Sequence, residues 1–205
     1  QISINYDYDN KGLIKFITDG KGLVSRFTYD NFGYQKTQTN PENITTKSSY
    51  NARGQKLTAT DGNGQTTTFA YDSSDRVTEK KLGNRTWTTV YANGGRKRTE
   101  IDPKLNPAVS EFDAQGRIIK VTNAKTDVMT YVYDDSGNKT SETDFGGHTT
   151  TFEYYNTHRL KGKTDPQGSG GNNKVTTYAY DNVGNVKSET TANRVTEYDY
   201  EPNRY

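Results

Sequence analysis

The chain has 205 residues, a formal net charge of +2 at pH 7 and no cysteine. The lack of cysteine excludes disulfides, thiol catalysis and zinc–thiolate centres, and the near-zero net charge is a poor match for a nucleic-acid-binding protein. Hydrophobic residues make up only 29% of the chain, which is low for an ordinary globular core, yet 12% of the chain is aromatic, which is high for a disordered segment. No apolar run is long enough to span a membrane.

An aromatic residue recurs at intervals of about 21 residues and is usually followed by Asp or Asn. A period of this size is typical of repeat proteins, in which each small unit completes its packing against its neighbours. Disordered chains have no reason to keep such a register. We call these ten aromatic residues the anchors: Tyr8, Tyr29, Tyr50, Tyr71, Tyr91, Phe112, Tyr133, Tyr154, Tyr180 and Tyr200.

Each repeat carries two turn signals. The first opens at the residue after the anchor, as in Asp9–Gly12, and the second opens eleven residues after the anchor, as in Asp19–Gly22. The Asp or Asn side chain caps the turn, and Gly supplies the positive φ that closes it. Pro41, Pro103 and Pro166 each follow a turn-opening Asn or Asp, where the fixed φ of proline is suitable. In chain order, the clearest turns span residues 9–12, 19–22, 30–33, 61–64, 113–116, 134–137, 144–147, 165–168 and 181–184.

The stretches between these turns are six or seven residues long and rich in Thr, Val, Tyr and Phe, so they predict strands joined as antiparallel hairpins. Two repeats shorten the second turn, to Gly83-Asn84 and Ala192-Asn193, and one inserts residues 169–173 there, which leaves the strands intact. No helical periodicity is present. The sequence therefore predicts an all-β repeat array of about nine hairpins, spanning residues 1–205 and cut from a longer array.

A second aromatic residue stands two positions before seven of the anchors. Because residues i and i+2 share one face of a strand, these residues and the anchors predict a single aromatic stripe. Thr66, Thr68, Glu153 and Glu197 are expected on the opposite, solvent face. The additional stripe residues are Tyr6, Phe27, Phe69, Tyr131, Phe152, Tyr178 and Tyr198. Aliphatic residues near the turn exits are expected on the stripe side of the facing strand: Ile14, Leu57, Val77, Ile118, Leu160 and Val186.

The stripe has two interpretations: the packed face of the sheet itself, or a surface on which sugar rings stack. For glycan contact the aromatic residues outside the stripe are the better candidates. Trp87, the only tryptophan, comes first. The others are Phe16, Phe32, Tyr34, Phe145, Tyr155 and Tyr205.

No group of residues predicts catalysis, a cofactor or a metal. His148 and His158 lie beside turns and belong to no catalytic motif. The segment from Asp7 to Gly12 has alternating oxygen ligands but lacks the downstream Glu of a calcium loop, and turn capping explains its acidic residues. Arg96-Lys97-Arg98 is the densest basic cluster, but Glu100 follows on the same strand face, so no nucleic-acid partner is expected.

These motifs resemble the YD repeat of Rhs-type proteins. The resemblance rests on Tyr-Asp, then Gly with Arg and an aliphatic residue (Gly116-Arg117-Ile118; compare Arg76-Val77), then Thr-Asp-x-x-Gly, then Thr-x-Phe/Tyr-x-Tyr-Asp. The family includes bacterial polymorphic toxins, shell components of insecticidal toxin complexes and animal teneurins. Departures are the turns at residues 72–75 and 155–158, which lack glycine, and the anchors Tyr91 and Tyr154, which lack the following acid.

The resemblance implies a long twisted sheet that spirals into a hollow shell, which in bacterial members encloses a toxic C-terminal domain. It implies a secreted or cell-surface protein whose partners are adjoining repeats and an enclosed effector, with this chain as non-catalytic wall. A carbohydrate-binding adhesin or an extracellular fibre is the alternative, because glycan binding has been attributed to such repeats. Exposed sheet edges also predict self-association.

Overall fold

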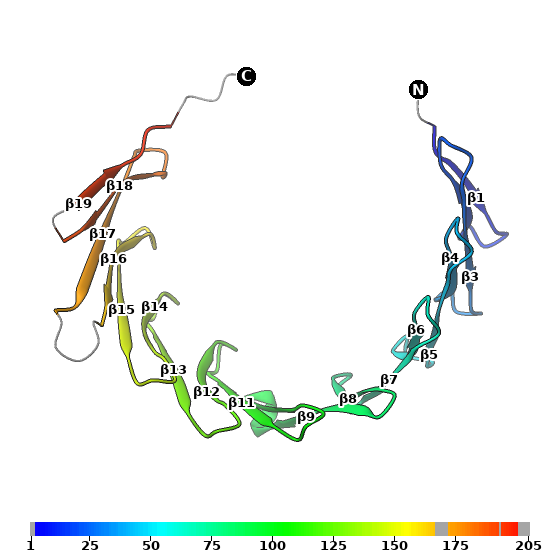
Figure 1. Cartoon of the computed structure of the whole chain (residues 1–205), viewed down its shortest axis with the longest axis horizontal. Coiled ribbons are helices and arrows are strands. Elements are labelled where there is room, and N and C mark those ends of the chain that lie inside the picture. The colour runs from blue at the N-terminus through cyan, green and yellow to red at the C-terminus, as the bar shows by residue number, and fades with distance from the viewer. Residues whose placement is uncertain (1–2, 167–171, 193, 201–205) are drawn as a thin grey trace. The chain divides into compact units, whose positions relative to one another are not determined.

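The computed structural model describes residues 3–166, 172–192 and 194–200. Over these residues the chain forms 19 β-strands and one 3₁₀ turn, Asn93–Gly95 (Figure 1). The predicted all-β array of antiparallel hairpins is confirmed. The predicted turn at Asp165–Gly168, the inserted segment 169–173, the short turn at Ala192-Asn193 and Tyr205 lie wholly or partly outside the described residues.

The chain forms two compact units, residues 1–90 with 99–106, and residues 91–98 with 107–205. Strands β9 (Arg85–Ala92) and β10 (Lys97–Ile101) have residues in both units. The first unit also contains β1 (Asn5–Tyr8), β2 (Ile14–Thr18), β3 (Val24–Tyr29), β4 (Gln35–Thr39), β5 (Thr45–Tyr50), β6 (Lys56–Thr60), β7 (Thr66–Tyr71) and β8 (Val77–Leu82). The second contains β11 (Pro107–Phe112), β12 (Ile118–Thr122), β13 (Val128–Tyr133), β14 (Lys139–Thr143), β15 (Thr149–Tyr154), β16 (Leu160–Asp165), β17 (Lys174–Tyr180), β18 (Val186–Thr191) and β19 (Arg194–Glu197).

The turns form as their sequences predict. In the turn at Asp9–Gly12, the Gly12 N–H donates to the Asp9 carbonyl and the Asp9 N–H donates to the Leu13 carbonyl. The Asp9 Oδ1 accepts the N–H groups of Lys11 and Leu13, both at 2.9 Å. Gly12 has φ 79°, the left-handed conformation that glycine adopts without strain. The same bonds recur at the turn that begins at Asp19, so one loop type closes both ends of a hairpin.

A β-bulge follows every first turn in the eight hairpins whose register the structure describes. Asp7 pairs with Phe16 but Tyr8 pairs with Ile14, so Lys15 is an extra residue on the second strand. The bulge corrects one expectation from the sequence. Leu57 was expected on the stripe side, but Tyr50 pairs with Lys56 and Leu57 is the extra residue. Ile14, Val77, Ile118, Leu160 and Val186 do pair with anchors.

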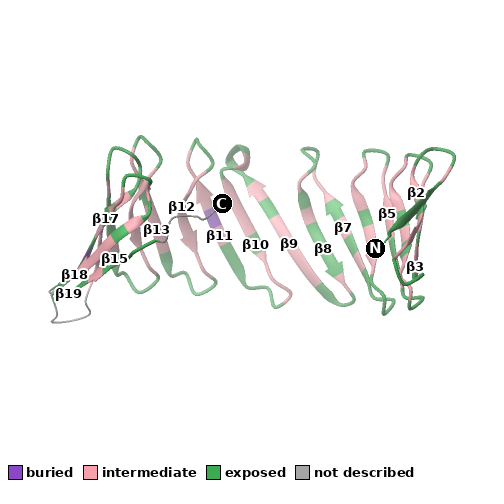
Figure 2. Ribbon diagram, turned by 90° about the horizontal axis from the view of Figure 1, so that it is seen from above, coloured by how far each residue is buried: buried purple, intermediate pink, exposed green. Residues whose placement is uncertain are grey.

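Within each unit the sheet is a single layer. Among the described residues, strands contact only their neighbours in sequence, and no apolar side chain is buried. The buried side chains are the small polar ones of Ser110 and Thr176, as the scarcity of purple in Figure 2 illustrates. The four residues predicted on the solvent face, Thr66, Thr68, Glu153 and Glu197, are exposed. No helix in the described part of the chain has the length and apolar character needed to cross a membrane.

Several turns place a residue other than glycine in the left-handed position. Leu105 has φ 65° and is 80% exposed, and Thr126 has φ 70°. A side chain with a Cβ is strained in this conformation. We predict that Leu105→Gly raises the free energy of unfolding by about 1 kcal/mol, because the strain removed exceeds the entropy gained by the unfolded chain. Urea-induced unfolding followed by circular dichroism measures this change.

Gly22→Ala provides the matched control at the same position of another turn. A Cβ on Gly22 would meet no atom within 4 Å, and the φ of this residue is 81°, so the substitution adds only backbone strain. It is expected to lower the free energy of unfolding by about 1 kcal/mol. A loss of stability in Leu105→Gly would contradict the strain at this turn.

Candidate functional site

The anchor tyrosines connect successive hairpins through their hydroxyl groups. The Tyr71 hydroxyl donates to the backbone carbonyl of Lys56 at 2.8 Å. The acceptor always belongs to the residue paired with the preceding anchor. The other pairs are Tyr29 to Ile14 (2.8 Å), Tyr133 to Ile118 (3.0 Å), Tyr154 to Lys139 (2.9 Å), Tyr180 to Leu160 (2.9 Å) and Tyr200 to Val186 (3.0 Å).

The bulge explains why these carbonyls accept a side-chain donor. The ladder between β6 and β7 pairs Thr58 with Thr68 and does not extend to Lys56. On that side the Lys56 carbonyl has no strand partner in the described ladder, and an unpaired backbone acceptor in a partly buried position is unfavourable. The tyrosine hydroxyl supplies the missing donor. The anchor therefore links two hairpins at the point where the hydrogen-bonded ladder between them ends.

The stripe face is half-exposed and carries charge as well as rings. Residues that pair directly across a strand share a face, and Tyr131 lies opposite Glu142, Phe152 opposite Lys163 and Tyr178 opposite Glu189. Basic groups also lie over the rings. The Arg117 guanidinium is 4.6 Å from the Tyr133 ring centroid, and the Lys139 Nζ is 4.9 Å from that of Phe152. This face is a mixed aromatic and charged surface.

Burial raises the pKa of the hydroxyl groups of Tyr131, Tyr154 and Tyr178 above the ordinary 10.0. These phenols are therefore neutral at physiological pH and keep the proton that a donor needs. For Tyr154 that proton makes the bond to the Lys139 carbonyl.

Trp87 lies on the same face as the stripe, not apart from it as the sequence suggested. It pairs with Lys80, which pairs with Phe69, and all three therefore share one face. The Lys80 Nζ is 5.3 Å and the Arg85 guanidinium carbon 5.9 Å from the Trp87 ring centroid. The indole is accordingly a half-buried ring flanked by two cations.

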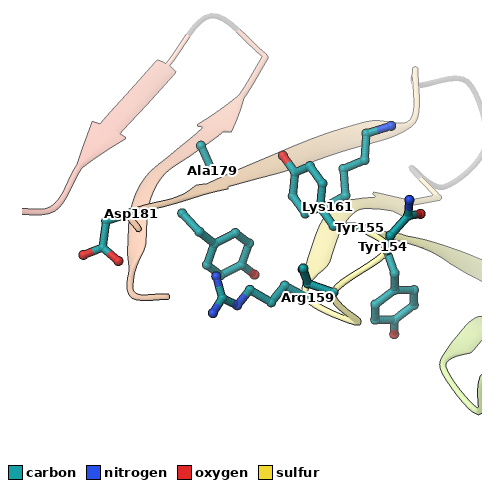
Figure 3. Close-up of a pocket in the computed structure, with 9 residues that line it drawn as sticks. Tyr154, Tyr155, Arg159, Lys161, Ala179 and Asp181 are labelled. Carbon is teal, nitrogen blue, oxygen red and sulfur yellow. The ribbon is translucent and has the colours of Figure 1, made fainter. Parts of the chain in front are cut away.

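An open groove of about 630 Å³ lies beside the turn at residues 155–158. Tyr155 stands where other turns have Asp, and its hydroxyl donates to the Tyr178 carbonyl at 3.0 Å. Figure 3 shows Arg159 and Lys161 on one side of this groove and Ala179 and Asp181 on the other. The Tyr155 and Tyr180 rings meet edge to face with centroids 6.1 Å apart. Of the aromatic residues placed outside the stripe by sequence, Tyr155 is the one that lines this groove.

No group of three or more His, Asp or Glu side chains in the described residues is arranged to hold a metal ion. The acidic residues instead cap turns. His148, on an exposed turn, places its Nδ1 3.2 Å from the Asp144 carboxylate. The segment that begins at Asp7 folds as an ordinary turn through Asp9.

We predict that Tyr71→Phe lowers the free energy of unfolding by about 1 kcal/mol, because it removes the hydroxyl donor and leaves the Lys56 carbonyl unpaired. Tyr50→Phe is the control, since the Tyr50 hydroxyl has no hydrogen-bond partner in the described part of the chain and its ring contacts Tyr34. Chemical denaturation of both variants measures the difference. Equal effects would show that the anchors act through their rings alone.

Turn aspartates predict a loss of stability in acid. The side-chain hydrogen bond from Arg76 holds the pKa of Asp72 below the ordinary 3.8. A side-chain hydrogen bond from Asn106 lowers the pKa of Asp102 in the same way. The backbone N–H of His148 lowers the pKa of Asp144. A carboxyl with a lower pKa when folded contributes stability above its unfolded pKa, and this contribution is lost as the pH falls through the folded pKa. The thermal unfolding midpoint should therefore fall as the pH falls below about 4.

The triple variant Asp72→Asn, Asp102→Asn, Asp144→Asn tests the cause of this decrease. Asparagine keeps the acceptor, because the Asn51 Oδ1 accepts the N–H groups of Arg53 and Gln55 in an equivalent turn. The variant is expected to show a smaller decrease in unfolding midpoint between pH 5 and pH 2 than the parent chain. An equal decrease would assign the acid sensitivity to other groups.

The family description "RHS Repeat" matches residues 50–86 and 112–149, and no curated protein matches the chain. Among solved structures, the crystal structure of TcdB2-TccC3-Cdc42 is similar, with a TM-score of 0.56 and 16% identity, over 93% of this chain and 13% of that one. The crystal structure of TcdB2-TccC3 gives a TM-score of 0.55 at 16% identity, over 93% of this chain and 14% of that one.

A Tc holotoxin pore of Photorhabdus luminescens gives a TM-score of 0.54 at 16% identity, over 91% of this chain and 13% of that one. At this identity the likeness concerns the fold. The chain spans only 13% to 14% of the length of these structures. Residues 50–86 and 112–149 thus match the RHS repeat, and both segments lie within the array of bulged, tyrosine-linked hairpins.

Proposed function

We propose that this chain is a wall segment of an Rhs-type shell in an exported protein, that it is non-catalytic, and that its parent encloses an effector domain. The observation that carries the proposal is the single-layer sheet, in which no apolar side chain of the described residues is buried. Such a sheet is stabilised by further hairpins that pair with its edge strands. A continuous wall would provide these hairpins. The likeness in fold to toxin-complex structures supports the same role.

The half-exposed stripe also suits a wall. The rings paired with Glu142, Lys163 and Glu189 form a mixed surface. Such a surface can contact either water or an enclosed polypeptide. Neither face needs a second layer. We extend the proposal to a single array over residues 1–205, joined to further repeats of the parent, with a secreted or cell-surface location.

Limited proteolysis of the complete natural protein tests this function. We expect its effector domain to resist cleavage under conditions that degrade the same domain expressed alone, because the wall excludes the protease. Cryo-electron microscopy of the intact protein would then place these residues in a closed shell. Equal cleavage rates for the enclosed and the isolated domain would contradict the proposal.

The groove beside Tyr155 favours glycan binding as a second candidate function. Tyr154, Tyr155 and Tyr180 line the groove, next to Arg159 and Lys161. A glycan array probed with the whole chain should give binding that Tyr155→Ala abolishes. Loss through Trp87→Ala instead would move the site to the stripe, and an array without signal would exclude this candidate.

A further inference from the structure

Side chains at one edge of the sheet contact the turn of the following hairpin. We define the exit residue as the residue five positions after an anchor, where the chain leaves its first turn. The receiving residue is four positions after the next anchor, at the left-handed position of the next first turn. Seven such pairs lie inside one or other unit of the described chain.

Where the exit residue is large, the receiving residue is glycine. A Cβ on Gly54 would lie 2.7 Å from Tyr34 Cζ, and one on Gly184 would lie 2.8 Å from Arg159 Cζ, so the end of the exit side chain would have to move to admit it. A Cβ on Gly33 would be 3.7 Å from Leu13 Cδ1, and one on Gly137 would be 3.7 Å from Arg117 Nη1. Four exit residues thus lie against the bare backbone of the next turn.

Where the exit residue is an amide, the receiving residue is polar. The Gln55 Nε2 donates to the Asp75 Oδ1 at 2.8 Å, and the Arg53 Nη1 lies 3.2 Å from the same oxygen. The Asn138 Oδ1 and the His158 Nδ1 are 3.2 Å apart. Asp75 and His158 have φ of 63° and 61°, a conformation that favours glycine. Both residues adopt this conformation with a polar contact to the preceding hairpin.

The seventh pair differs. Arg96 precedes Gly116, but a Cβ on Gly116 would meet nothing within 4 Å. Arg96 follows the 3₁₀ turn Asn93–Gly95, which stands in place of the usual loop. The rule therefore depends on the ordinary first turn.

We infer that each hairpin recognises its successor through this pair, so that the repeats of the array are matched and not interchangeable. A large exit residue packs against glycine in the next turn, and an amide exit residue meets a polar partner there. The surface is the first-turn edge of a hairpin, and its partner is another hairpin of the same array with the complementary receiving residue. This recognition is independent of whether the parent forms a shell.

Two deletions of equal length separate matched from mismatched junctions. Removing residues 29–49 places Leu13 before Gly54, a large residue before glycine. Removing residues 50–70 places Tyr34 before Asp75, a large residue before a side chain. Each deletion takes out one 21-residue repeat and preserves the anchor spacing. We expect the first variant to keep the unfolding midpoint of the full chain to within about 2 °C, and the second to lose at least about 4 °C.

The substitution Asp75→Gly then distinguishes a mismatched junction from a general loss of stability caused by the deletion. In the 50–70 deletion it should restore the midpoint, because Tyr34 again meets glycine. In the full chain it should not raise the midpoint, because Gln55 and Arg53 lose their partner. Equal midpoints for the two deletions, or a 50–70 deletion that stays unstable or unfolded with Asp75→Gly, would overturn the inference.

A double-mutant cycle tests the rule in the second unit. Asn138→Arg should raise the unfolding equilibrium constant about tenfold more in the presence of His158 than in a His158→Gly background, where it recreates the Arg117–Gly137 pair. Gln115→Arg, at an exposed turn position, is the control and should be additive with His158→Gly. Additivity in both cycles would refute the pairing.

Discussion

The structure depends on the satisfaction of backbone carbonyl groups in a sheet that has only one layer. Along most of each strand the neighbouring strand provides the donor, but the bulge after each first turn ends the ladder early. At that point a phenol hydroxyl from the next hairpin completes the bonding, as Tyr71 does for Lys56. Six of the nine tyrosine anchors make this hydrogen bond, so most junctions between hairpins repeat it. Phe112, an anchor without a hydroxyl, uses its N–H to reach the Arg96 carbonyl instead.

Other interactions also connect only neighbouring strands or successive hairpins. Beside the second turns, threonine hydroxyls pair across the strands, as between Thr60 and Thr66 at 2.8 Å and between Thr143 and Thr149 at 2.8 Å. Cations lie over rings within a hairpin or on the next one. Each interaction is modest, but each is repeated along the array. Stability in such a system is a sum over neighbours, as expected for a linear repeat protein.

The sequence predicted the features that depend on local geometry. Asp9 and Gly12 define their turn because few other residues cap a loop or adopt a positive φ, and the same signal located most of the turns. The bulge was not predictable, because the alternation of residues around Lys56 and Leu57 fits a regular ladder equally well. This one-residue shift determines which residue pairs with an anchor and which backbone carbonyl accepts the hydroxyl of the next tyrosine. The sheet face on which Trp87 lies likewise follows from its pairing with Lys80. The spacing of residues in the sequence does not give that pairing. The RHS repeat was recognisable from the motifs, whereas the groove at Tyr155 required the juxtaposition of two hairpins.

The lack of buried apolar side chains among the described residues affects how the protein responds to cold. The heat capacity change on unfolding comes chiefly from apolar surface newly exposed to water, and in this sheet much of that surface is already exposed when folded. The heat capacity increment per residue is therefore smaller than in a globular domain of equal length. A smaller increment flattens the dependence of stability on temperature and so opposes cold denaturation.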